Sequence, residues 1–156
     1  MKLKILAVGQ KMPAWVTTGY QEYAKRMPHE CSLEVMEIAP AKRTKQSNIA
    51  KIVDNEGDRI LAVIKDTDYV VALEVKGKQW STEGLANKLS AWQGIHTHII
   101  FVIGGPDGLS DKCLKRADEQ WCLSPLTFPH PLVRVILAEQ LYRGWSLMNN
   151  HPYHRE

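Results

Sequence analysis

The stretch Ile99-Ile-Phe-Val-Ile-Gly-Gly-Pro-Asp-Gly108 runs the most apolar segment of the chain into a glycine turn. An apolar run without polar alternation is typical of a parallel strand that is covered on both faces, so we predict a buried strand over His98 to Ile103. The glycines at 104, 105 and 108 allow close backbone approach or positive φ. The turn is therefore either a tight strand-to-helix connection or a place where the backbone meets a ligand.

Segments of the same character recur along the chain, each followed by a helical pattern. Further strands are predicted at Lys2 to Val8, Leu33 to Ile38, Tyr69 to Val75 and Trp121 to Leu123. We expect the polar Lys76-Gly-Lys78 to close the third strand in a turn. Helices are predicted from Pro13 to about Met27, from Ile49 to Ile64 with an interruption at Gly57, from Ser81 to Gly94, from Ser110 to about Asp118, and from Pro131 to about Asn149.

The alternation of strand and helix predicts an α/β fold with a largely parallel sheet and helices on both faces. No linker or repeat divides the sequence, so we expect one domain over residues 1–156. The last predicted helix is apolar on more than one face, from Val133 through Met148. One domain core would not use all of that surface, and we infer that a second subunit covers part of it in a homodimer.

Composition narrows the function classes. The chain has 44% apolar residues and no apolar run near the roughly 18 residues of a membrane span, so we expect no membrane association and a cytoplasmic protein. Three cysteines without CxxC spacing suggest neither disulfides nor zinc, and the histidines lack metal-site spacing, so we expect no metal. The net charge of +3 neither demands nor excludes RNA.

Ligands of open parallel sheets bind at the carboxyl ends of the strands, which directs attention to the loops after the third, fourth and fifth strands. The sequence lacks both GxGxxG after its first strand and a P-loop after its fourth, so a ligand there need not carry phosphate. The apolar loop Leu123 to Phe128 is either a wall for an aromatic ring or a buried connection. Neither Cys122 nor Ser124 has the neighbours of a nucleophile, and covalent catalysis finds little support.

Four separated motifs closely resemble the RlmH family, also called YbeA-type proteins, and the likeness extends over the whole chain, including Met1 to Trp15. The motifs are Ile103-Gly-Gly-Pro-Asp-Gly-Leu109, Leu123-Ser-Pro-Leu-Thr-Phe-Pro-His-Pro-Leu-Val-Arg134, Ala138-Glu-Gln-Leu-Tyr-Arg143 and Asn150-His-Pro-Tyr-His-Arg155. The sequence departs from the family pattern at Asp107, where glutamate is expected, and at Gly144, where alanine is common.

The resemblance implies a SPOUT methyltransferase with a C-terminal trefoil knot, which transfers a methyl group from S-adenosylmethionine to N3 of a pseudouridine in 23S ribosomal RNA of the large subunit, on assembled ribosomes. It also implies a homodimer. A non-enzymatic ribosome-binding factor with the same fold is the main alternative, and a small-molecule enzyme that uses a nucleotide is the second.

The resemblance assigns roles to particular residues. Cofactor-binding residues are expected at Leu73, Gly104, Gly105, Gly108, Leu123, Ser124, Pro125, Leu126, Thr127 and Phe128. Candidates for easing proton loss from N3 are His154 as a base and Arg155 or Arg134 as stabilising charges. Candidates for RNA contact are Lys42, Arg43, Lys45, Tyr153, His154 and Arg155, with Lys76 and Lys78 as further phosphate contacts.

Overall fold

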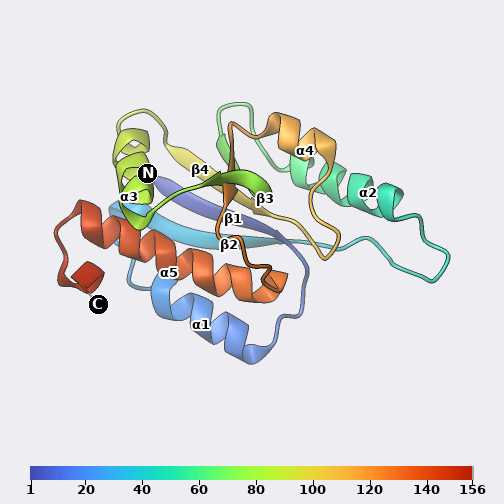
Figure 1. Ribbon diagram of the computed structural model, residues 1–156, viewed down its shortest axis with the longest axis horizontal. Helices are drawn as coiled ribbons and strands as arrows, with labels where there is room; N and C mark the ends of the chain where they lie inside the picture. The colour runs from blue at the N-terminus through green and yellow to red at the C-terminus, as the bar shows by residue number, and fades with distance from the viewer. Residues whose placement is uncertain (156) are drawn as a thin grey trace.

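The computed structural model describes the backbone of residues 1–155 and the side chains of residues 1–153. Its five strands form one sheet in the order β2-β1-β4-β3-β5, and every pairing within it is parallel (Figure 1). The strands are β1 (Lys2–Val8), β2 (Ser32–Ile38), β3 (Tyr69–Gln79), β4 (His98–Ile103) and β5 (Glu119–Cys122). The helices are α1 (Ala14–Ala24), α2 (Ile49–Ala62), α3 (Thr82–Gln93), α4 (Asp111–Arg116) and α5 (His130–Met148), with short 3₁₀ turns η1 (His29–Cys31) and η2 (Pro152–Arg155).

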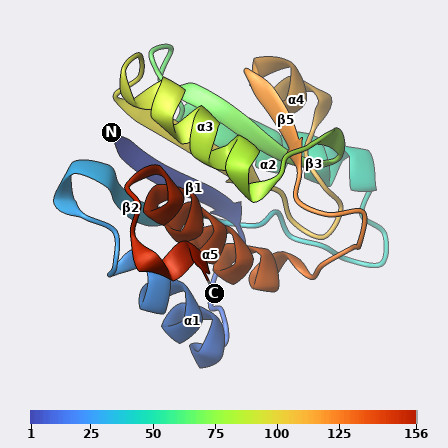
Figure 2. The same ribbon diagram turned by 60° about the vertical axis from the view of Figure 1, so that its left-hand side comes forward.

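The sheet separates two hydrophobic cores. Along β1, Leu3 and Ile5 point into the core beneath α1, α3 and α5, whereas Leu6 and Val8 point into the core beneath α2 and α4. Figures 1 and 2 show α5 lying between α1 and α3 on one face, with α2 and α4 on the other. Both faces are covered along β4 from Ile99 and along β1 from Ile5, and the side chains there are apolar on both faces, as the continuous apolar runs predict. The predicted α/β fold, with helices on both faces of a parallel sheet, is confirmed.

Two glycines have a role different from the one that the sequence suggests. Lys76-Gly-Lys78 is not a turn, because β3 continues through it to Gln79. A Cβ at Gly77 would lie 2.6 Å from the backbone of Gln120, so this glycine permits close contact between β3 and β5. Gly57 does not interrupt α2, and a Cβ there would lie 2.2 Å from Ser110 Oγ. Both glycines therefore serve close packing.

Helix α5 contacts α1 on one side and α3 on the other. The approach is close at two glycines: a Cβ at Gly19 of α1 would lie 3.2 Å from Val135, and a Cβ at Gly144 would lie 2.9 Å from Leu89 of α3. Much of the apolar surface of α5 is thus covered within one chain, and the homodimer stays a prediction. Among residues 1–155, no helix is both long and apolar enough to cross a bilayer.

Candidate functional site

A cavity of about 440 Å³ opens at the carboxyl ends of β3, β4 and β5 and reaches the beginning of α5. Its lining includes nine of the ten residues expected to bind a cofactor, namely Leu73, Gly104, Gly105, Gly108, Leu123, Ser124, Leu126, Thr127 and Phe128. Pro125 is not among the lining residues. The lining also contains Glu74, Val75, Ile103, Asp107, Leu109, Leu114, Trp121, Cys122, His130 and Val133. Three loops that are far apart in sequence therefore surround one space.

The cavity lies beside an irregularity in the pairing of β3 with β5. Leu73 and Lys78 both pair with Trp121, so residues 74–77 have no counterpart in β5. Within this bulge, the side chains of Glu74 and Val75 line the cavity, and Val75 is largely exposed. A bulge of this kind redirects side chains at the end of a strand. The bulge has no signal in the sequence, whose pattern predicts a regular apolar strand that ends at Val75.

The glycine turn forms a second wall, and each of two glycines is required for a separate reason. A Cβ at Gly104 would lie 2.7 Å from the carbonyl carbon of Gly108, because the turn folds tightly back on itself. Gly108 has φ +84°, a conformation that residues with a side chain rarely adopt. The Gly108 N–H donates to the Gly105 carbonyl over 3.0 Å and closes the turn. The backbone can therefore approach a bound molecule closely.

The loop from Leu123 to Phe128 forms the third wall. The Leu126 N–H donates to Ser124 Oγ over 3.0 Å, and the Cys122 thiol donates to the Ser124 carbonyl over 3.1 Å. The side chain of Leu126 is 69% exposed beside the cavity, which is unusual for leucine. Local hydrogen bonds thus hold the loop while it presents an apolar side chain to the space.

The electrostatic character of the cavity is neutral to acidic. Among the described side chains, those that line it include the carboxylates of Glu74 and Asp107 but no lysine or arginine. His130 lines the cavity at the first residue of α5, and burial together with the nearby charges of Arg134 and Arg43 lowers its pKa from the usual 6.5. A neutral imidazole beside two carboxylates is not a site for a phosphate group.

His130 and Glu74 are lining residues that sequence reasoning did not select. In the sequence, His130 is one of several histidines that lack metal-site spacing. In the structure, its Nδ1 is buried without a hydrogen-bond partner among the described residues. Its position directly after Pro129, at the start of a helix that follows a strand end, was the available signal. Glu74 was hidden because the irregular pairing of β3 cannot be seen in the sequence.

Arg134 is not among the residues that line this cavity. Its Nη1 donates to Glu37 Oε2 over 2.7 Å and its Nη2 donates to the Gly9 carbonyl over 3.0 Å. The side chain is almost completely buried, and it lines a separate cavity of about 280 Å³ between α1 and β2. The structure thus gives Arg134 a structural ion pair, and its proposed contribution to catalysis stays a prediction.

The C-terminal tail packs along α5. The Tyr153 hydroxyl donates to Glu139 Oε2 over 2.8 Å, and the Arg143 and Arg26 guanidinium groups lie 5.0 and 5.8 Å from the Tyr153 ring centre. Burial and the bond to Glu139 raise the pKa of Tyr153, so its hydroxyl stays protonated. None of these residues lines the cavity. The side chains of His154 and Arg155 lie outside the described residues.

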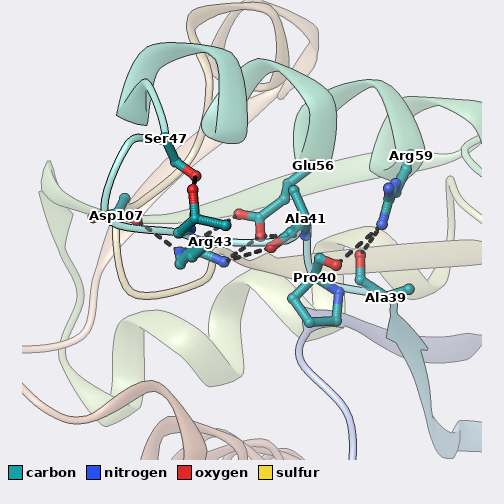
Figure 3. A network of polar contacts seen from close by, with 9 residues as sticks. Ala39, Pro40, Ala41, Arg43, Ser47, Glu56, Arg59 and Asp107 are labelled. Carbon is teal, nitrogen blue, oxygen red and sulfur yellow. Dashed lines mark hydrogen bonds and ion pairs between the residues drawn. The ribbon is translucent and has the colours of Figure 1, made fainter.

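The basic loop between β2 and α2 has two exposed lysines and one arginine whose guanidinium forms ion pairs within the chain. Lys42 and Lys45 are exposed. The Arg43 guanidinium instead binds Glu56 and Asp107, as Figure 3 shows. Lys76 and Lys78 are exposed on β3. Among the basic candidates for RNA contact whose side chains the structure describes, Arg43 is therefore the one that forms ion pairs within the chain.

The described side chains offer no evident ligand set for a resident metal ion. Within the part of the chain that the structure describes, no three His, Cys, Asp or Glu side chains are grouped as metal ligands would be.

Comparison with known proteins adds independent information. A family model described as "Predicted SPOUT methyltransferase" matches residues 1–154. Proteins from Methylococcus capsulatus, Marinomonas sp. and Hahella chejuensis, each named "Ribosomal RNA large subunit methyltransferase H", are 55%, 53% and 52% identical to this chain. The alignments cover 99%, 99% and 100% of this chain and all of each relative.

A solved structure, described as a probable methylase family protein from Haemophilus influenzae Rd KW20, has the same fold with a TM-score of 0.59. It is 12% identical, and the match covers 96% of this chain and 69% of that one. The full-length family match, the close relatives and the parallel sheet with its cavity lead to one conclusion: the chain belongs to the SPOUT methyltransferase family.

Proposed function

We propose that this protein transfers a methyl group from S-adenosylmethionine to N3 of a pseudouridine in large-subunit ribosomal RNA, with the assembled ribosome as substrate. The observation that carries the proposal is the cavity at the strand ends, which has glycine-backbone and apolar walls and, among its described lining side chains, no lysine or arginine. The names of the full-length relatives support ribosomal RNA as the substrate class.

The residues around the cavity suit S-adenosylmethionine. The cavity volume of about 440 Å³ lies within the usual range for small-molecule sites. The ligand has an adenine ring, a sulfonium cation and no phosphate. Apolar side chains such as Leu126 and Phe128 suit the ring, the carboxylates suit the cation, and the absence of basic lining groups agrees with the absence of phosphate. When bound, the cofactor would supply a methyl group that its sulfonium already activates.

The protein's own contribution is then orientation and proton removal. The glycine turn and the Leu123 to Phe128 loop would fix the methyl donor, and such fixed geometry supplies much of the acceleration in a displacement between two bound reactants. N3 of the acceptor base must also lose a proton, and no side chain needs to form a covalent bond. We assign proton removal to His154 and stabilisation of the resulting negative charge to Arg155, with Arg134 as a further candidate.

The position of the tail constrains this assignment. Tyr153 binds Glu139, and neither residue lines the cavity of the same chain. We therefore propose that the tail of a second copy supplies the proton acceptor in the homodimer. The trefoil knot and a cytoplasmic location belong to the same proposal. Lys42, Lys45 and the tail would contact RNA phosphates, with Lys76 and Lys78 as further candidates.

Titration calorimetry with S-adenosylmethionine tests the cofactor directly. We expect saturable binding, and no heat at millimolar ligand would refute a methyltransferase. Incubation with labelled cofactor and either ribosomes, large subunits or free RNA then tests the substrate. We expect label in ribosomal RNA from ribosomes, at a pseudouridine identified by mass spectrometry of nuclease fragments. Ribosome binding without cofactor binding or label would instead indicate a non-enzymatic factor.

His154→Ala tests the tail. It should lower the methyl-transfer rate and leave the cofactor Kd unchanged, with His151→Ala as a matched control in the same tail. Normal turnover of the His154→Ala protein would remove His154 from the mechanism. A mixed dimer of a His154→Ala chain and a Gly104→Ala chain should recover part of the activity only if one subunit's tail serves the other subunit's cavity.

A further inference from the structure

One buried carboxylate on α2 anchors the basic loop to the cavity wall. Glu56 is 2% exposed and accepts hydrogen bonds from Arg43 Nη1 at 2.9 Å, from Arg43 Nη2 at 3.2 Å and from the Ala41 N–H at 3.0 Å. A buried carboxylate needs such partners, because an unpaired charge is costly in an apolar interior. Two donors of a planar guanidinium fix both its position and its plane.

The same guanidinium reaches the glycine turn. Arg43 Nε donates to Asp107 Oδ2 over 3.1 Å, so one side chain connects α2 to the turn (Figure 3). The turn also rests on this pair: a Cβ at Gly105 would lie 3.3 Å from Glu56 Oε1 and 3.5 Å from Arg43 Nη2. Asp107, Gly104, Gly105 and Gly108 all line the cavity. The Arg43–Glu56 pair thus lies directly behind the wall that would meet a ligand.

We propose that Arg43 is a positioning residue, which holds the 104–108 turn in the conformation that binds the cofactor. This inference rests on the proposed use of S-adenosylmethionine. Arg43 then has an internal role instead of the RNA contact expected from the sequence, whereas Lys42 and Lys45 remain available to phosphates. Loss of Arg43 would lower the fraction of molecules whose 104–108 turn has the binding conformation. The apparent affinity for a ligand falls in proportion to that fraction.

The chain offers a matched control in Arg59. Its Nη1 donates to the carbonyls of Ala39 and Pro40 at 2.8 and 3.2 Å, so it restrains the same loop without a contact to the turn. Arg59→Ala removes a loop restraint of similar kind. Asp107→Ala removes the bond to the turn and leaves the Arg43–Glu56 pair intact. It also removes a carboxylate from the cavity lining, so its effect on the turn is measured by hydrogen exchange without ligand. This second variant keeps the proposal testable if Arg43→Ala, which leaves Glu56 unpaired, does not fold.

Calorimetry with S-adenosylhomocysteine and steady-state kinetics provide the first readouts. Arg43→Ala and Asp107→Ala should each raise the Kd about fivefold to tenfold. The cofactor KM should rise equally, with kcat nearly unchanged. The double variant should lose less affinity than the sum of the two single losses, because both substitutions remove the Arg43–Asp107 contact. Arg43→Lys should not restore affinity, since one ammonium cannot reproduce a planar fork between two carboxylates. Arg59→Ala should bind like the wild type.

Hydrogen exchange of the backbone amides of Gly104, Gly105, Asp107 and Gly108, without ligand, provides the second readout. Exchange should accelerate in Arg43→Ala and Asp107→Ala but not in Arg59→Ala. Unchanged affinity in both turn variants, additive effects in the double variant, or an equal loss in Arg59→Ala would overturn the proposal. If the wild type bound no cofactor, the proposed function would fail, and so would the role of Arg43 in cofactor binding. Hydrogen exchange would still decide whether Arg43 holds the turn.

Discussion

Substitution of Gly104 by alanine should damage the protein at the point where the turn is tightest. The added Cβ would lie 2.7 and 2.8 Å from the carbonyl carbon and oxygen of Gly108 and 3.1 Å from Leu109 Cγ. Carbon atoms pack at about 3.5 Å or more, so the turn must open by roughly 0.8 Å. The obstacle is backbone, which cannot rotate away as a side chain can. We therefore expect the upper part of the usual range for overpacking, about 2–3 kcal/mol.

The assay is thermal unfolding followed by circular dichroism, with calorimetry of cofactor binding on the same samples. In a domain of this size, the loss corresponds to a Tm decrease of about 4–12 °C. Gly94→Ala is the control, because an added Cβ there has no atom within 4 Å and the φ angle of −86° suits alanine. It should raise stability by about 0.4–1 kcal/mol through the unfolded state. Equal Tm and cofactor affinity in Gly104→Ala and wild type would refute the argument.

Three further substitutions test other parts of the structure. His130 has its pKa lowered in the folded state, so folding favours the neutral ring, and stability should fall as pH decreases below 6.5. His130→Gln should reduce the slope of the unfolding free energy against pH, measured by urea unfolding, by up to about 1.4 kcal/mol per pH unit. Equal slopes in the variant and the wild type would exclude the effect. Glu37→Ala leaves the buried Arg134 cation without its carboxylate and should cost about 1.5–3 kcal/mol by urea unfolding, whereas a loss below about 0.5 kcal/mol would show that water replaces the pair. Ser110 accepts from the Cys113 N–H at the start of α4, so Ser110→Ala should cost about 1 kcal/mol, and an unchanged Tm would contradict this capping role.

The fold was largely predictable because its signals are local. Continuous apolar runs identify strands covered on both faces. Two of the predicted helices begin at Ser81 and Ser110, and both side chains accept hydrogen bonds there as N-caps. The errors at Gly57 and Gly77 have a common cause: a glycine that permits close packing has the same sequence appearance as one that breaks an element. Only the tertiary partner distinguishes the two.

The candidate site was predictable where it consists of loops at strand ends, and less so where it depends on pairing between distant residues. The glycine turn stood out by composition. Glu56 did not, because nothing in an amphipathic helix marks one carboxylate as buried, and its partner Arg43 lies in a run of basic residues that is typical of solvated surface. The resemblance to a family supplied the expected roles, but not the inward direction of Arg43 or the position of Tyr153.

Helix α5 fixes the distance between the cavity and the docked tail. His130 and Val133 at its beginning line the cavity, and Glu139 in its middle binds Tyr153. Glu139 follows Val133 by six positions along the helix, which is about 9 Å of helical rise. Inserting one residue between them would rotate the tail's anchor by about 100° around the helix axis. The number of residues in this segment is therefore under tighter geometric constraint than their identity, and length variation is expected in loops rather than here.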